Sequence, residues 1–127
     1  MIVLLDTTVL IDALRNKRNR RALLAELAEN GHILATSSVN LGEVYSGMRP
    51  QEKPQTDTFL DCLECYPLTS VIARRAGSLK YEWAQRGRTL TLADMVVAAT
   101  ALEYSLVLMT DNSKDFPLPE LNFHPLP

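Results

Sequence analysis

Four carboxylates are the residues of this sequence with the clearest potential for chemistry. Each stands where a strand or loop passes into a helix: Asp6 in LLDTTVLID, Glu43 in SSVNLGEVYSG, Asp94 in LTLADMVVAAT and Asp115 in TDNSKDF. Their apolar surroundings are typical of protein core, where a lone carboxylate is costly to bury. Carboxylates held together near a core repel one another, and a hard divalent ion with oxygen ligands resolves that repulsion most simply. The pattern therefore favours metal-assisted phosphoryl chemistry.

Structural roles are the alternative for these acids. Asp6 could cap the helix that follows it, since Asp is among the best N-cap residues. Glu43 stands three residues after Asn40, which is the spacing of a capping box, and it could equally be an exposed surface glutamate. Spacing leaves these alternatives open for Glu43, whereas the position of Asp6 directly after an apolar run favours a functional role.

Asp94 combines a capping position with an unusual setting. Thr91 precedes it by three residues, as in a capping box. No other charged residue occurs between Arg88 and Glu103, in a helix expected to be wholly buried. An unpaired carboxylate there would be costly or would take up a proton, and metal coordination removes the difficulty.

A polar loop after the last long apolar run carries the fourth acid. Thr110, Asp111, Asn112 and Asp115 all occur in it, and turns attract such residues for purely local reasons. Spacing does not decide which of them faces the other acids.

Short apolar runs alternate with helical patterns along the chain. Strands are expected at Met1–Leu5, Ile33–Thr36, Tyr66–Thr69, Leu106–Met109 and Asn122–Leu126. Helices are expected at Val9–Leu14, Arg21–Asn30, Leu41–Met48, Thr56–Cys65, Ser70–Arg86 and Leu92–Tyr104. This alternation predicts an α/β fold in one domain over residues 1–127, with a mostly parallel sheet covered on both faces. Ligands of such sheets bind at the carboxyl ends of the strands, where Asp6 and the Thr110–Asp115 loop both belong.

Composition limits the partners that this chain can attract. Hydrophobic residues make up 46% and charged residues 22% of 127 residues, which is ordinary for a soluble globular protein. The net charge of −2 excludes a global positive field, so any contact with nucleic acid must be local. One basic cluster exists, which could also be a solvated loop: Arg15, Lys17, Arg18, Arg20 and Arg21.

The two cysteines and the N-terminal segment carry little functional signal. Cys62 and Cys65 lack a second Cys or His pair at metal-ligand spacing, so we expect ordinary thiols in a reducing, cytoplasmic compartment. The apolar start MIVLL is too short for a signal peptide or a membrane span.

The four acidic segments, in this order and at these spacings, resemble the PIN-domain nucleases, and more closely the VapC-type toxins of prokaryotic toxin–antitoxin pairs. The match covers nearly the whole chain. Its most specific part is the segment LTLADMVVAATALEYSLVLMT, followed by the T-x-N-x-x-D-F loop. The resemblance implies a three-layer α/β/α fold with a short, mostly parallel sheet of four to five strands.

The resemblance also implies roles for individual residues. Asp6, Glu43 and Asp94 would hold Mg²⁺ or Mn²⁺. The last motif would supply a fourth acidic or amide group and matches Asn112 and Asp115, and Asp111 beside them leaves open which position bears the fourth carboxylate. Thr110 and Asn112 would be polar supports, as would Thr8, which stands where many members have Asn or Ser. The implied activity is hydrolysis of phosphodiester bonds in a structured RNA such as a tRNA or an rRNA.

RNA, a small VapB-type antitoxin and a second copy of the chain are the partners that the resemblance implies. An acidic crevice repels RNA, so flanking cations must help to bind it. The candidates are Arg15, Lys17, Arg18, Arg20, Arg21, Arg86 and Arg88. The antitoxin is expected on apolar residues between Arg21 and Cys65, which could also be plain core: Leu23, Leu24, Leu27, Tyr45, Met48, Phe59, Leu60 and Leu63. The alternative function is a non-catalytic RNA-binding or scaffold PIN-like domain.

Overall fold

A five-stranded parallel sheet forms the centre of the molecule in the computed structural model, which describes all 127 residues. Its strands are β1 (Ile2–Leu5), β2 (Ile33–Ser37), β3 (Glu64–Tyr66), β4 (Val107–Met109) and β5 (Asn122–Phe123). They lie in the order β3-β2-β1-β4-β5, so β1 is central and both of its neighbours run parallel to it. The predicted parallel sheet and its edge strand near the C-terminus are confirmed.

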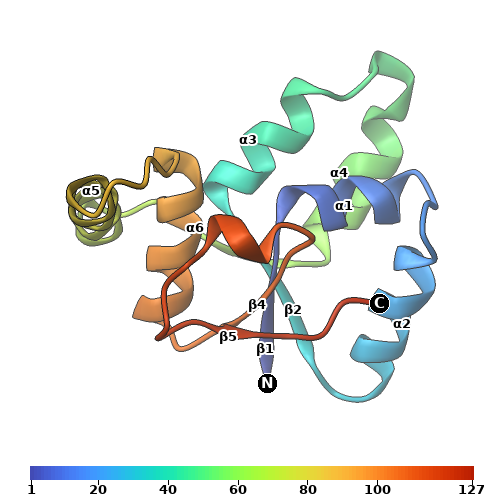
Figure 1. The fold of residues 1–127 in the computed structure, drawn as a ribbon. Helices are drawn as coiled ribbons and strands as arrows, with labels where there is room; N and C mark the ends of the chain where they lie inside the picture. The colour runs from blue at the N-terminus through green and yellow to red at the C-terminus, as the bar shows by residue number, and fades with distance from the viewer.

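Six α-helices cover the two faces of this sheet (Figure 1). They are α1 (Thr7–Leu14), α2 (Arg20–Glu29), α3 (Ser38–Ser46), α4 (Lys53–Asp61), α5 (Ser70–Gln85) and α6 (Leu92–Glu103). Two short 3₁₀ turns, η1 (Pro50–Glu52) and η2 (Ser113–Asp115), lie in the connections. None of the six helices combines the length and the hydrophobicity that a membrane span requires.

Alternation along the central strand builds one core on each face. Leu4 packs into a cluster with α5 and α6, whereas Val3 and Leu5 pack into a second cluster with α1, α2 and parts of α3 and α4. The same alternation occurs in β4, where Leu108 and Met109 point to opposite clusters. The result is the three-layer α/β/α arrangement that the resemblance implied.

The segment around the two cysteines differs from its prediction. The helix expected over Thr56–Cys65 ends at Asp61, and residues Glu64–Tyr66 form β3 instead of the strand expected over Tyr66–Thr69. The three residues of β3 are mostly exposed at the sheet edge and pair only with β2, so long-range pairing decides their conformation. Cys62 and Cys65 are both free and exposed.

Two carboxyl-terminal strand ends meet at the centre of the sheet. Asp6 directly follows β1, and its N–H donates to the carbonyl oxygen of Met109 at the end of β4 over 3.0 Å. This pairing brings Asp6 beside Thr110, although 104 residues separate them in sequence. The sheet order therefore places the predicted crevice residues of β1 and β4 side by side.

Candidate active site

Asp6 is held by neutral donors from three segments. Its side chain is 7% exposed. Oδ1 accepts hydrogen bonds from the Thr7 N–H at 2.9 Å and from Asn40 Nδ2 at 3.2 Å, and Oδ2 accepts one from the Thr110 hydroxyl at 2.8 Å. Asp6 is thus the N-cap of α1 as well as a member of the site. These hydrogen bonds fix the position of the Asp6 carboxylate, and no basic side chain of the chain pairs with it.

Asn40 is a site residue that the sequence analysis did not identify. It is fully buried, and its amide group donates both to Asp6 and to the Thr7 hydroxyl, at 2.9 Å in the second case. The N-cap of α3 is Ser37, with Asn40 completing the capping box, so the alternative box that the Asn40–Glu43 spacing allowed does not form. The S-x-x-N spacing in SSVN was the signal that could have revealed it.

Glu43 joins the site through a hydroxyl of α1. Its Oε1 accepts a hydrogen bond from the Thr7 hydroxyl at 2.7 Å, and that hydroxyl accepts the one from Asn40. Thr7 therefore connects α3 to the first turn of α1, whereas the neighbouring Thr8, which is half-buried, takes no part in these bonds. Glu43 remains exposed to solvent beyond this contact.

The surroundings of Asp94 disfavour the charged form of its carboxylate. It is half-buried at the start of α6, where its N–H donates to the Thr91 hydroxyl at 3.1 Å, as predicted. Burial raises the pKa of Asp94, and the charges of Asp6, Asp115 and Glu43 raise it further against a hydrogen bond from Thr91. Acids from four separate segments therefore act on one another at this end of the sheet.

The chemistry of these donors fits a hard divalent cation. Oxygen atoms are the only ligands that the acids offer, and the groups that shift Asp94 include no basic side chain. The side chains do not form a closed cluster, since no three His, Cys, Asp or Glu residues converge as ligands of one ion. The fit to a divalent cation thus rests on the oxygen ligands that the acids offer and on the negative charge that they share.

The two acids of the loop after β4 have different partners. Asp115 lies in η2, half-buried, and acts on Asp94. Asp111 points elsewhere, because its two oxygens form salt bridges with Arg18 at 2.9 Å and Arg20 at 3.0 Å. Asn112 is exposed, and its N–H donates to the Thr110 hydroxyl at 3.0 Å.

Most of the basic candidates already have partners within the chain. Arg15 pairs with Glu52, Arg18 with Asp12 and Asp111, and Arg20, which is 4% exposed, with Asp111. Arg21 donates to the last carbonyl groups of α1, at Ala13 and Leu14. Arg86 stacks on the Trp83 ring at 4.7 Å, and Arg88 donates to the carbonyl oxygen of Lys114. Lys17 is exposed, without a salt bridge.

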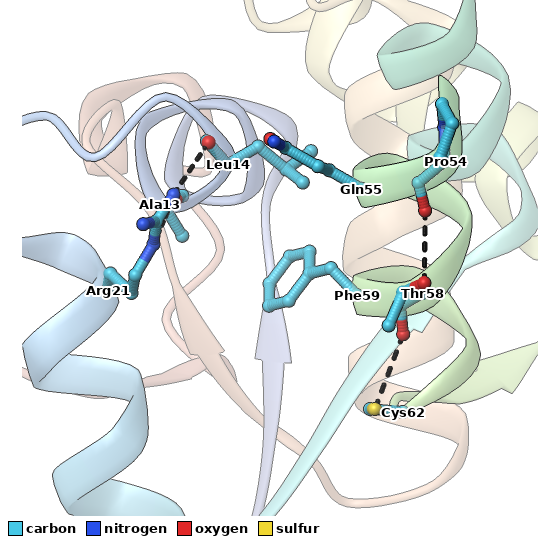
Figure 2. Close-up of a pocket in the computed structure, with 8 residues that line it drawn as sticks. All are labelled: Ala13, Leu14, Arg21, Pro54, Gln55, Thr58, Phe59 and Cys62. Carbon is cyan, nitrogen blue, oxygen red and sulfur yellow. Dashed lines mark hydrogen bonds between the residues drawn. The ribbon is translucent and has the colours of Figure 1, made fainter. Parts of the chain in front are cut away.

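A groove of about 560 Å³ lies between α1, α2 and α4, on a different part of the surface from the acids. Figure 2 shows the Phe59 ring pointing from α4 toward α1 and α2, with Arg21 on the opposite wall and Cys62 at one end. Of the apolar residues expected to form a partner surface, Leu24, Leu27 and Leu60 are buried in the core, which corrects that prediction. Phe59 lines the groove and Tyr45 is 38% exposed.

Comparisons with known proteins agree on one family. The family model described as "PIN domain" matches residues 3–118. Ribonuclease VapC19 of Mycobacterium tuberculosis strain H37Rv is 34% identical over 115 residues, 91% of this chain and 92% of that protein. Ribonuclease VapC10 of the same strain is 35% identical over 117 residues, 92% of this chain and 87% of that protein.

Solved structures give the same result. VapBC2 from Rickettsia felis, bound to a DNA fragment from its promoter, superposes with a TM-score of 0.85 at 27% identity, covering 98% of both chains. A toxin–antitoxin complex from Klebsiella pneumoniae has a TM-score of 0.80 at 27% identity, again over 98% of both chains.

Proposed function

Since this chain belongs to the PIN-domain family, and within it to the VapC ribonucleases, we propose that it is a divalent-metal-dependent endoribonuclease and the toxin of a toxin–antitoxin pair. The observation that carries this proposal is the setting of Asp94. Burial raises its pKa, and the charges of Asp6, Asp115 and Glu43, which come from three other segments, raise it further. A site that gathers uncompensated carboxylates at strand ends is suited to a cation and a phosphate.

Asp6 and Asp94 would hold Mg²⁺ or Mn²⁺, with Glu43 and Asp115 completing the ligand set. When bound, the ion supplies acidity to a water molecule and neutralises charge that develops on the phosphate. The residues of this chain orient the site. Asn40 and Thr110 fix the two oxygens of Asp6, and Thr7 holds Glu43.

Direct attack of water on the phosphodiester is the mechanism we infer, without a covalent intermediate. The two histidines lie together, with ring centroids 6.4 Å apart, and His32 approaches the N-terminal amino group at 3.4 Å. That contact places His32 at the amino end of β1, whereas Asp6 follows the carboxyl end of the same strand, so His32 cannot serve as general base there. Cys62 is the C-cap of α4 and Cys65 lies in the edge strand β3, and both thiols are free and exposed.

RNA would be held by exposed cations that form no salt bridge within the chain. Lys17, Arg86 and Arg88 are exposed and form no salt bridge with an acid. Each phosphate contact releases counterions, so loss of one should weaken binding and reduce its salt dependence. tRNA or an rRNA loop is the proposed substrate class.

An antitoxin segment would occupy the groove between α1, α2 and α4. Both solved structures described above are toxin–antitoxin complexes. A basic side chain of that partner, extended toward Asp6 and Asp94, would cancel the charge that the metal needs and so explain inhibition. We include a homodimer in the proposal, and a non-catalytic scaffold is the alternative.

RNA sequencing tests the function directly. The 5′ ends of total RNA are sequenced after brief expression of wild type, Asp6→Asn, Asp94→Asn and a control, Asp61→Asn, an exposed aspartate on α4. We expect defined new ends with wild type and Asp61→Asn, and loss of cleavage on the order of 100-fold or more with the other two, as when a charge-stabilising group is removed from an active site. Wild-type cleavage by repurified Asp6→Asn or Asp94→Asn protein would refute the metal assignment. A chain without divalent-dependent cleavage or thermal shift would favour the scaffold.

A further inference from the structure

Asp111 connects the basic cluster to the candidate active site. It follows Thr110, whose hydroxyl donates to Asp6 at 2.8 Å, and its own carboxylate accepts from Arg18 at 2.9 Å and Arg20 at 3.0 Å. We propose that Arg18 and Arg20 are positioning residues: through Asp111 they hold the loop after β4 so that Thr110 and Asp115 face the other acids. This inference rests on the proposed nuclease function, and it assigns these arginines a role other than RNA binding.

Charge balance argues against a phosphate site at these arginines. Arg18 Nε donates to Asp12 Oδ2 at 2.8 Å in addition to the contact of Arg18 with Asp111. Two guanidinium groups thus face two carboxylates, which leaves no net positive charge to attract RNA. The same contacts join α1, which carries Asp12, to the loop after β4.

The Arg20 side chain is buried, so it depends on specific hydrogen-bond partners. Arg20 is 4% exposed, and its Nη1 also donates to the carbonyl oxygen of Pro127 at 2.8 Å. A guanidinium in this position depends on fixed partners, because a buried charge without one is strongly unfavourable. Its planar fork reaches Asp111 and Pro127 at once, and the single ammonium group of a lysine cannot reproduce that geometry.

Backbone conformation in the α1–α2 connection is a second, independent observation. Asn16, Arg18 and Asn19 all have positive φ, at 53°, 50° and 59°. Residues other than glycine adopt this left-handed conformation at a cost and keep it where surrounding contacts determine it. The two salt bridges of Arg18 supply such contacts. The backbone of the α1–α2 connection therefore places both arginines next to Asp111.

Kinetics separate positioning from RNA binding. A phosphate-binding side chain changes the apparent KM and the salt dependence, whereas a positioning residue changes kcat. The variants are Arg18→Met, Arg20→Lys and Asp111→Asn in the full chain, with Asp61→Asn as the matched carboxylate control and Lys17→Met as the RNA-binding comparison. The substrate is total tRNA with Mn²⁺. Arg18→Met keeps the test valid if a change at the buried Arg20 prevents folding, because the Arg18 side chain is 52% exposed.

Hydrogen exchange adds a readout that needs no cleavage. The Asn112 N–H is bonded to the Thr110 hydroxyl, so its exchange rate reports how firmly the loop is held. We expect kcat to fall on the order of 10-fold in Arg18→Met, Arg20→Lys and Asp111→Asn, since small misplacements of catalytic groups cost at least this much. Exchange of the Asn112 amide should rise several-fold, with KM and salt dependence unchanged. Lys17→Met should raise KM and leave exchange unchanged.

The outcomes separate the two proposals. Unchanged exchange at Asn112 in Asp111→Asn would overturn the positioning role. A raised KM with weaker salt dependence and normal kcat in Arg18→Met would overturn it too, in favour of RNA contact. Faster exchange in a chain that cleaves no RNA in any divalent metal would support the loop contact and refute the nuclease function.

Discussion

At the scale of single residues, Asp6 and Asp94 differ in how their charges are accommodated. Asp6 receives three hydrogen bonds from neutral groups, so its orientation is fixed in the metal-free chain. The pKa of Asp94 is raised by burial and by the surrounding acids. We infer that metal binding is felt most at Asp94, where a proton competes with the ion.

Stability of the metal-free chain should depend on pH through Asp94. An acid with a pKa higher in the folded than in the unfolded chain stabilises the fold below its ordinary pKa, and this contribution is lost as pH rises through the raised value. Thermal unfolding without metal should therefore show Tm falling across that interval in wild type and less in Asp94→Asn. The Tm gain on adding Mn²⁺ should grow over the same interval. Identical pH profiles for the two proteins would contradict this.

Asn40 should matter for both stability and cleavage. Asn40→Leu removes the donors to Asp6 and Thr7, and leaving such buried groups unpaired costs about 1–3 kcal/mol. Asn40→Asp adds a buried carboxylate beside Asp6, so it should lower Tm at neutral pH and recover part of it with Mn²⁺. Chemical denaturation and cleavage assays measure these effects. Asn30→Leu and Asn30→Asp, at an exposed helix end, are the controls, and an equal loss in them would exclude a specific role.

At the scale of elements, α1 connects the acidic site to the groove. Its first turn carries Thr7 and is capped by Asp6, and its last turn contributes Ala13 and Leu14 to the groove wall. Eight residues at 1.5 Å per residue make α1 about 12 Å long. A few residues of an antitoxin segment leaving the groove could therefore reach the carboxylates.

Filling the groove should separate inhibition from catalysis. Thr58→Trp places an indole on the exposed groove face of α4, beside Phe59. The variant should capture less antitoxin in co-expression pull-downs while cleaving RNA at the wild-type rate in isolation. Asn30→Trp, which adds an indole at the C-cap of α2 outside the groove, should retain the partner. Full antitoxin capture by Thr58→Trp would place the antitoxin surface elsewhere.

At the scale of the whole molecule, α5 exposes two large apolar side chains outside the groove. α5 exposes Val71 at 59% and Tyr81 at 60%, beside a shallow hollow that includes Gly77. Contiguous apolar patches mark interaction surfaces, and these two side chains would belong to one if a second chain packed against α5. They support the proposed second copy of the chain.

Expression of the chain alone tests toxicity and assembly together. Wild type should arrest growth or accumulate poorly, because no antitoxin restrains it, whereas Asp94→Asn should accumulate well. Light scattering of purified Asp94→Asn protein should give twice the mass of one chain. A harmless, abundant, monomeric wild type would contradict the partner proposals and leave the fold intact.

Local sequence was sufficient to predict the framework. Short apolar runs alternating with helical periodicity predicted the parallel sheet, because buried parallel strands need apolar residues on both faces. Four acids at strand or loop ends predicted a metal site, which stays a prediction, and the Thr91–Asp94 cap is confirmed because its signal spans only three residues.

Tertiary structure alone decided which polar groups became partners. Asp111 looked as suitable as Asp115 for the site, but Arg18, 93 residues away, pairs with it. Asn40 looked like a helix cap of its own, yet it orients Asp6, 34 residues away. Segments far apart in sequence meet only when β1 lies between β2 and β4. Burial then requires each polar group to find a nearby partner, and local patterns carry no information about which one it will be.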